Sequence, residues 1–252
     1  MLILKTWLTP NWGDAINPDL VKLISGQETR VVEARETIKT TNYIVVGSVL
    51  KFADDNTVVW GAGFLSANEN FSKFRPEIKA VRGPKTRKRL LDLNYECPEI
   101  YGDPALLFPR YYKPQVEKKF KLGIIPHWKD EFHPVLRRMQ GKPLPDGVVK
   151  IHHNLGTYEF INAICSCERI ASSSLHGIIA ADAYGIPSIQ IEFEKCDMFK
   201  FEDYYLSANR NYNNPVNCSN SIDVDKIMKS FYDYTISIDL DKLMANCPFK
   251  KG

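Results

Sequence analysis

The residues best suited to chemistry follow predicted β-strands. Residues 169–191 predict a strand, a serine-rich turn, a short apolar helix and a second strand. His176 falls in the first turn of that helix, just after Ser173 and Ser174. In open α/β sheets, ligands bind at the carboxyl ends of strands and beside helix N-termini. We therefore predict a ligand site around His176, with the serines as caps or hydrogen-bonding groups.

Three further candidates follow other predicted strands. Arg82 precedes a Gly-Pro turn, and an arginine can bind a phosphate or a carboxylate through two hydrogen bonds. His127, like His176, titrates near neutral pH when unperturbed and suits proton transfer. Asp14 follows a tight turn near the N-terminus and offers a carboxylate. Each has a structural alternative: a histidine can simply cap a helix, Arg82 can lie on the surface, and residues 11–14 can serve only as a turn and helix cap.

The sequence predicts no metal site. His152 and His153 resemble a metal-binding pair, but neighbouring residues on a strand point to opposite faces, so we interpret them as structural or rim residues. No Asp/His cluster has the spacing of metal ligands, and Cys165 and Cys167 have neither the usual two-residue spacing nor a second pair. Asp103, before a proline, is interpreted as a turn former.

Composition favours a globular protein acting on small molecules. The 252 residues are 44% hydrophobic, and the net charge of +3 is too mild to predict a nucleic-acid partner. The six cysteines are spread widely and no signal peptide is evident, which favours reduced thiols in a cytoplasmic protein. No apolar run approaches the ~20 residues that span a bilayer.

Strand and helix patterns alternate along the chain, which predicts an α/β fold with two Rossmann-like domains. Residues 1–112 form the first predicted domain and residues 120–220 the second, joined by a Pro-containing, charged linker. Residues 221–252 are expected to be helices that pack across or behind the domains. The predicted elements with the clearest bounds are strands over 42–48, 57–60 and 121–125 and helices from Pro84 to about residue 93, over 131–139, 158–165, 199–206, 224–234 and 240–247.

Seven short segments, taken in order, resemble the polysaccharide pyruvyl transferase family. The matching segments are Asn-Trp-Gly-Asp-Ala-Ile-Asn at 11–17, Val-Gly-Ser at 46–48, Trp-Gly-Ala-Gly at 60–63, Ala-Val-Arg-Gly-Pro at 80–84, Tyr-Gly-Asp-Pro-Ala-Leu-Leu at 101–107, Ile-Pro-His-Trp at 125–128 and Ser-Ser-Leu-His-Gly at 173–177. The resemblance runs to about residue 200 and is strongest around Arg82 and His176.

The resemblance implies a glycosyltransferase-B-like arrangement, with two domains facing across a cleft. It implies transfer of pyruvate from phosphoenolpyruvate (PEP) to two hydroxyls of one hexose, forming a cyclic ketal and releasing phosphate, in capsule, exopolysaccharide or cell-wall glycan synthesis. No cofactor is implied. The N-terminal domain is expected on the acceptor side and the C-terminal domain on the donor side. The sugar acceptor in such families can be lipid-linked, which would bring the protein into peripheral contact with the inner face of the cytoplasmic membrane.

The ketal chemistry requires anion-binding groups and two acid/base groups. We assign His176 as the general acid/base, His127 as a donor contact or second proton carrier, and Asp14 as the group that orients or deprotonates the sugar hydroxyl. The expected substrate-binding residues are Arg82, Ser173, Ser174, Asn11, Gly13, Ser48 and Lys195, the last being the nearest match to a lysine implicated in some members.

The sequence departs from the family pattern in two ways, and two alternative functions stay open. Some family members carry arginine where Ser174 stands, and the chain is short for the family. A nucleotide-sugar glycosyltransferase on the same fold would need an acidic residue for the ribose, which Glu192 or Glu194 can supply. A non-catalytic protein that kept the cleft is the other alternative.

Overall fold

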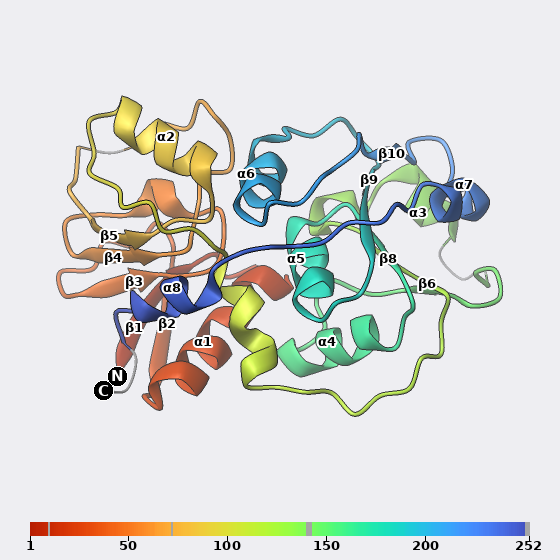
Figure 1. Ribbon diagram of the computed structural model, residues 1–252, viewed down its shortest axis with the longest axis horizontal. Coiled ribbons are helices and arrows are strands. Elements are labelled where there is room, and N and C mark those ends of the chain that lie inside the picture. Colours follow the sequence, from red (N-terminus) through yellow and green to blue (C-terminus); the bar gives the residue numbers. More distant parts are fainter. Residues whose placement is uncertain (10, 72, 140–142, 250–252) are drawn as a thin grey trace.

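The computed structural model describes residues 1–9, 11–71, 73–139 and 143–249, which form two parallel β-sheets (Figure 1). The first sheet has the strand order β2-β1-β3-β4-β5, and every neighbouring pair is parallel. Its strands are β1 (Leu2–Thr6), β2 (Thr29–Glu33), β3 (Asn42–Ile44), β4 (Thr57–Trp60) and β5 (Glu77–Ala80).

The second sheet repeats this topology with the order β10-β9-β8-β6-β7. Its strands are β6 (Leu122–Ile125), β7 (Val148–Lys150), β8 (Ile170–Ser172), β9 (Ser188–Glu192) and β10 (Val216–Asn217). In each sheet the first strand lies between the second and the third, so the direction of winding reverses beside β1 and beside β6. Such a reversal opens a crevice at the carboxyl ends of the two strands that flank it.

Local sequence explains where the best-defined helices begin and end. The helices are α1 (Trp12–Ser25), α2 (Pro84–Asp92), α3 (Pro134–Met139), α4 (Thr157–Cys165), α5 (Leu175–Ala183), α6 (Phe199–Ser207), α7 (Val224–Lys229) and α8 (Leu240–Ala245), with 3-10 turns η1 (Leu50–Phe52), η2 (Pro104–Arg110) and η3 (Trp128–Asp130). The Asn11 side chain accepts the Asp14 N–H at the start of α1, and Gly26 ends this helix in the left-handed conformation. Pro84 occupies the first turn of α2, as predicted.

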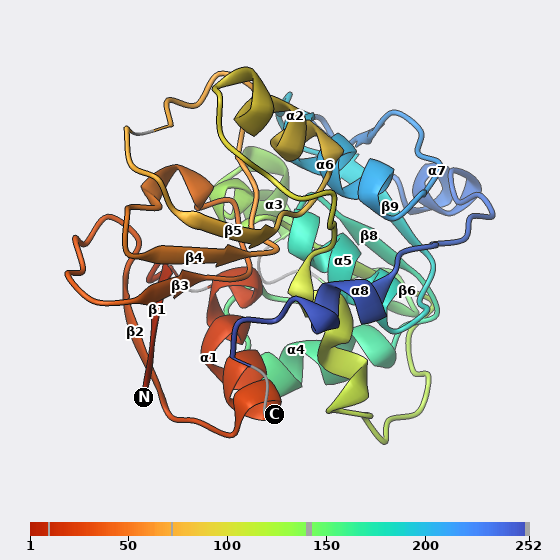
Figure 2. The ribbon, with the colours of Figure 1, turned by 60° about the vertical axis from the view of Figure 1, so that its left-hand side comes forward.

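One hydrophobic cluster contains residues of both halves, and each sheet has a further cluster beside it. Trp12 of α1 stacks on Phe160 of α4 with ring centroids 5.3 Å apart, and its indole N–H donates to the Thr157 carbonyl at 3.0 Å. Figure 2 shows α1 and α4 side by side below the sheets. Burial of this kind holds the two sheets in a fixed relation, so side chains of both can form one site.

The C-terminal segment contacts both halves. Ile227 of α7 is buried in the core of the second sheet. The chain then crosses back, and α8 packs on the first half, where the Trp60 indole donates to the Leu243 carbonyl at 2.9 Å (Figure 1). Within the described residues, no helix combines the length and the apolar character that crossing a bilayer requires.

The predicted α/β class with two Rossmann-like sheets is confirmed. Some element bounds were wrong. The strand predicted over 42–48 ends at Ile44, because the Asn17 side chain takes over both backbone groups of Val46, at 2.9 and 3.2 Å. The helix predicted from 131 begins only at Pro134, after η3 and a turn, and the helix predicted to end at 234 ends at Lys229. Four of the six cysteines are buried, namely Cys97, Cys167, Cys218 and Cys247.

Candidate functional site

One cavity of about 650 Å³ lies where both sheets reverse their winding. Side chains after β1 and β3 line it from the N-terminal half, and side chains after β6, β8 and β9 line it from the C-terminal half. Its volume is in the range of small-molecule sites. The lining includes eight predicted residues, namely Asn11, Asp14, Ser48, His127, Ser173, Ser174, His176 and Lys195.

On the N-terminal wall, Asp14 is a buried carboxylate held by three side chains. Thr6 donates to Oδ1 at 3.2 Å, Thr9 donates to Oδ2 at 2.6 Å, and the Asn11 amide donates to Oδ2. Burial raises the pKa of Asp14, while these donors and the nearby charge of His176 act in the opposite direction. The result is a fixed carboxylate that is a better proton acceptor than an exposed one.

His176 lies against Gly13 and Asp103. A Cβ at Gly13 would come within 2.0 Å of the His176 Nδ1, so only glycine leaves room for this ring. Gly13, a predicted substrate-binding residue, therefore makes room for His176 and is not itself among the residues that line the cavity. His176 Nε2 lies 3.5 Å from Asp103 Oδ2, and neither atom has a hydrogen-bond partner elsewhere in the described chain.

Asp103 does more than form the predicted turn. It is fully buried, and its other oxygen accepts the Ala105 N–H at the start of η2. One carboxylate oxygen is thus anchored to the backbone while the other faces the imidazole. The free oxygen of Asp103 is therefore positioned to orient the His176 ring.

The three serines of the turn before α5 differ in the hydrogen bonds that their hydroxyls make. Ser172 bonds within the turn, accepting the Ser174 N–H at 3.0 Å. Ser173 accepts the His127 N–H at 2.8 Å and donates to Asp130. Ser174 begins α5 but its side chain makes no capping bond there. Of the two predicted serine ligands, Ser174 is therefore the one whose hydroxyl is available to a ligand.

His127 is a neutral imidazole. Its Nδ1 accepts the Lys129 N–H at 3.2 Å, so its free proton sits on Nε2. Burial, together with the charges of Lys200 and Lys129, lowers the pKa of His127 to about 3. The ring can donate a hydrogen bond to a ligand at neutral pH, but this pKa does not fit the alternative role of second proton carrier.

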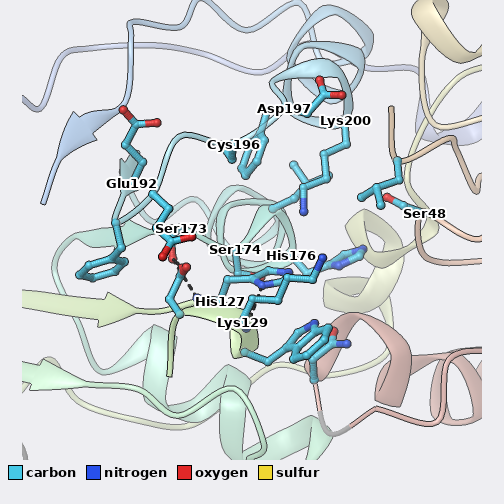
Figure 3. Close-up of a pocket in the computed structure, with 18 of the residues that line it drawn as sticks. Ser48, His127, Lys129, Ser173, Ser174, His176, Glu192, Cys196, Asp197 and Lys200 are labelled. Carbon is cyan, nitrogen blue, oxygen red and sulfur yellow. Dashed lines mark hydrogen bonds between the residues drawn. The ribbon is translucent and has the colours of Figure 1, made fainter. Parts of the chain in front are cut away.

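Four basic side chains line the cavity, and none of them forms an ion pair within the described part of the chain. They are Arg35, Lys129, Lys195 and Lys200. Lys129 and Lys200 point into the centre of the cavity, close to His127 and His176 (Figure 3). Burial and the charge of Arg82 lower the pKa of Lys200 to about 8. Lys200 was not predicted as a site residue, because its position on an amphipathic helix gives no sign that it faces a cavity.

Arg82, which was predicted to bind the donor, does not line the cavity. It is fully buried, and its Nε donates to Asp203 of α6 at 3.1 Å. One guanidinium nitrogen donates to the Phe64 carbonyl at 2.6 Å and the other to the Ser48 hydroxyl at 2.9 Å. Arg82 thus joins the two halves and reaches the cavity only through Ser48.

Carboxylates also line the C-terminal wall, beside these basic side chains. Glu192 and Glu194 line the cavity, as the glycosyltransferase alternative requires. Asp130 accepts from Ser173, and Asp197 accepts the Phe199 N–H near the start of α6 at 2.9 Å. Asp130 and Asp197 therefore have structural partners, while Lys200 has no carboxylate within ion-pair distance in the described chain.

The argument against a metal pair at His152 and His153 was wrong. Strand β7 ends at Lys150, so both histidines lie in the following turn, where the alternation of a strand no longer applies. Both face Glu131, and the three side chains form a group of metal-ligand type.

The fold and the cavity define the class: an α/β protein whose two Rossmann-like sheets direct their strand ends into one ligand-sized cavity. Residues 14–192 match the polysaccharide pyruvyl transferase family, and the chain belongs to this family. The resemblance drawn from the motifs is confirmed. An uncharacterized protein of Acanthamoeba polyphaga mimivirus is 28% identical over 204 residues, which cover 77% of this chain and 69% of that protein.

Proposed function

We propose that this protein transfers pyruvate from PEP to two hydroxyls of one hexose unit of a glycan. Its family supports pyruvyl transfer to a polysaccharide. The enol carbon of PEP gains a proton, and a sugar hydroxyl attacks the carbon that bears the phosphate. Phosphate then leaves, and the second hydroxyl closes the ketal. The two hydroxyl protons balance the proton added to the methyl group and the proton taken up by phosphate.

The unpaired bases of the cavity carry this proposal. PEP brings a phosphate and a carboxylate, and each needs a cation or several N–H donors. Lys200 is a partly buried ammonium without a carboxylate partner in the described chain, and Lys129 points toward the same space. The N-terminus of α5, with the Ser174 hydroxyl, adds backbone donors and a favourable dipole. Lys195 is placed to complete the anion site.

His176 is the proposed acid/base. Asp103 orients its ring, and His176 donates the proton that the enol carbon gains and takes a proton back later. Asp14, in electrostatic contact with His176, accepts the proton of the attacking hydroxyl. His127 donates a hydrogen bond from Nε2 to the donor substrate and stays neutral.

The N-terminal wall is the proposed acceptor side. Asn11, Asp14 and Ser48 offer an amide, a carboxylate and a hydroxyl group that can bind sugar hydroxyls. Trp7 on this wall and Trp128 on the opposite wall also line the cavity and can pack against the apolar face of a sugar ring. We place the protein in the cytoplasm, acting on a free or lipid-linked glycan precursor in exopolysaccharide or capsule synthesis, without a cofactor.

A nucleotide-sugar glycosyltransferase is the second candidate, because Glu192 and Glu194 both line the cavity. The two activities release different products. Purified protein is incubated with PEP and a galactoside or N-acetylhexosamine acceptor, and in parallel with sugar nucleotides. Acceptor-dependent phosphate release and an acceptor heavier by one pyruvyl ketal support the proposal. Release of nucleoside diphosphate supports the alternative, and no turnover together with ligand binding indicates a non-catalytic protein.

A further inference from the structure

Three side chains outside the cavity form a compact group at one edge of the second sheet. Each of Glu131, His152 and His153 offers one ligand atom, and these atoms lie within 4.8 Å of one another. His152 Nε2 lies 3.1 Å from Glu131 Oε1, and His153 Nε2 lies 3.8 Å from Glu131 Oε2. The two imidazole rings are 4.5 Å apart between centroids.

The topology explains why these residues meet. Glu131 follows η3, which comes directly after β6, and the two histidines follow β7. Strands β6 and β7 pair in parallel, so their carboxyl ends lie at the same edge of the sheet. The group is therefore built by two neighbouring strand ends and is anchored by the sheet itself.

We propose that Glu131, His152 and His153 bind a first-row divalent transition metal ion of the Zn²⁺ type. Two imidazole nitrogens and one carboxylate oxygen are the ligands that Zn²⁺ and its neighbours prefer, whereas Mg²⁺ and Ca²⁺ prefer oxygen alone. Ligand atoms around Zn²⁺ lie about 3.3 Å from one another, given bonds of about 2.0–2.1 Å. Small rotations of the three side chains bring the group from its present spacing to that value, and water fills the other coordination positions.

A simple ion pair explains less of the geometry. One histidine is enough to pair with Glu131, and His152 already does so. His153 is only 8% exposed and still directs its Nε2 toward the other oxygen of the same carboxylate. A divalent cation attracts the carboxylate and both ring nitrogens at once, which accounts for all three orientations.

The bound ion ties η3 to the end of β7. The segment from β6 through η3 also supplies His127, Lys129 and Asp130 to the cavity. Metal binding is therefore expected to stabilise this part of the cavity wall, although the ion itself lies outside the cavity lining.

Direct metal binding tests the proposal without any assay of turnover. Tag-free, chelator-treated full-length protein is titrated with Co²⁺ followed by its visible absorption, and with Zn²⁺ by calorimetry. We expect one ion per chain, visible Co²⁺ bands of a low-symmetry site, no thiolate charge-transfer band, and a higher unfolding midpoint with Zn²⁺. His153→Ala and Glu131→Gln should each weaken binding by more than about 100-fold, since even groups that only orient a ligand contribute ~10–100-fold.

His133→Ala is the matched control. His133 is near Glu131 in sequence, but its Nδ1 accepts the Val135 N–H and it is not part of the group. This variant should keep wild-type affinity. Three results would overturn the proposal: no Co²⁺ binding to the wild-type protein at millimolar concentration, a thiolate band that points to a cysteine site, or equal affinity in a folded His153→Ala variant.

Discussion

The first strand of each sheet ends at the cavity, and the residues that follow these two strands differ in chemistry. After β1 the chain supplies Thr9, Asn11 and Asp14, which offer hydroxyl, amide and carboxylate groups. After β6 it supplies His127 and Lys129. The strand order is the same in both sheets, so topology alone does not produce this difference.

The strand order therefore determines where the cavity lies, and the residues that follow the strands determine which ligand it can bind. Parallel strands bring their carboxyl ends to the edge where winding reverses, whatever residues follow. The C-terminal half then adds a second strand end with Ser174 and His176, and α6 with Lys200. The N-terminal wall thus offers mainly hydroxyl, amide and carboxylate groups, whereas the C-terminal wall carries Lys129, Lys195 and Lys200 among its carboxylates. Under the proposed function, the first wall binds the sugar and the second binds the anionic donor.

The largest effect is expected at His176, where the two walls meet. His176→Ala removes the proposed acid/base and should lower kcat for pyruvyl transfer by about 10²–10⁴-fold. Steady-state phosphate release measures this. A fall of less than tenfold would reject the role, provided that circular dichroism shows a folded variant.

The second-largest effect is expected from breaking the contact between Arg82 and Asp203, which connects the two halves. Arg82→Met leaves Asp203 buried without its cation and should cost about 3–5 kcal/mol in the free energy of unfolding. Urea denaturation measures the loss. Because Arg82 does not line the cavity, the KM for PEP of the folded variant should change little. A large rise in that KM without a loss of stability would instead restore Arg82 as a donor ligand.

Asp14→Asn tests the acceptor wall. The amide keeps the shape of the carboxylate but is not a base, so kcat should fall by about 10²-fold while the KM for PEP stays near that of the wild type. Initial rates with each substrate varied in turn separate the two constants. Equal losses in donor and acceptor binding would contradict the division between the walls.

Lys200 tests the proposed donor side of the cavity, where it should make donor binding depend on pH. In the proposed donor site the charged form of Lys200 binds the anion, and burial with the charge of Arg82 lowers the pKa of Lys200 to about 8. The KM for PEP should therefore be constant below pH 7 and rise as the pH passes 8, by up to about tenfold per pH unit.

Lys200→Met should raise that KM by about 10–100-fold at pH 7, the loss of one charge-assisted hydrogen bond. Lys200→Arg keeps its charge at every pH used and should abolish the rise above pH 8. If the wild-type rise persists in Lys200→Arg, another group controls donor binding.

Much of the fold could be predicted because its signals are local. The β-branched run before Trp60, the Pro84 helix start and the Asn11 cap each act within a few residues, and the structure has all three. The bounds failed where a distant group intervened, as where the Asn17 side chain bonds to Val46 and ends β3 early.

The residues of the site also fall into those that local sequence predicts and those that depend on distant contacts. The sequence by itself determined the family and the residues after strands that reach the cavity, including Asp14, Ser174 and His176. Short motifs and strand positions depend on residues that are close together in the chain.

Only the tertiary structure decided which charged groups face the cavity and which are buried. Arg82 lies behind Ser48 because Asp203, 121 positions away, takes its guanidinium, and Lys200 enters the cavity because α6 packs beside it. Glu131 meets His152 and His153 because β6 and β7 are neighbours. These outcomes depend on contacts between segments far apart in the chain, and neither spacing nor residue type encodes them.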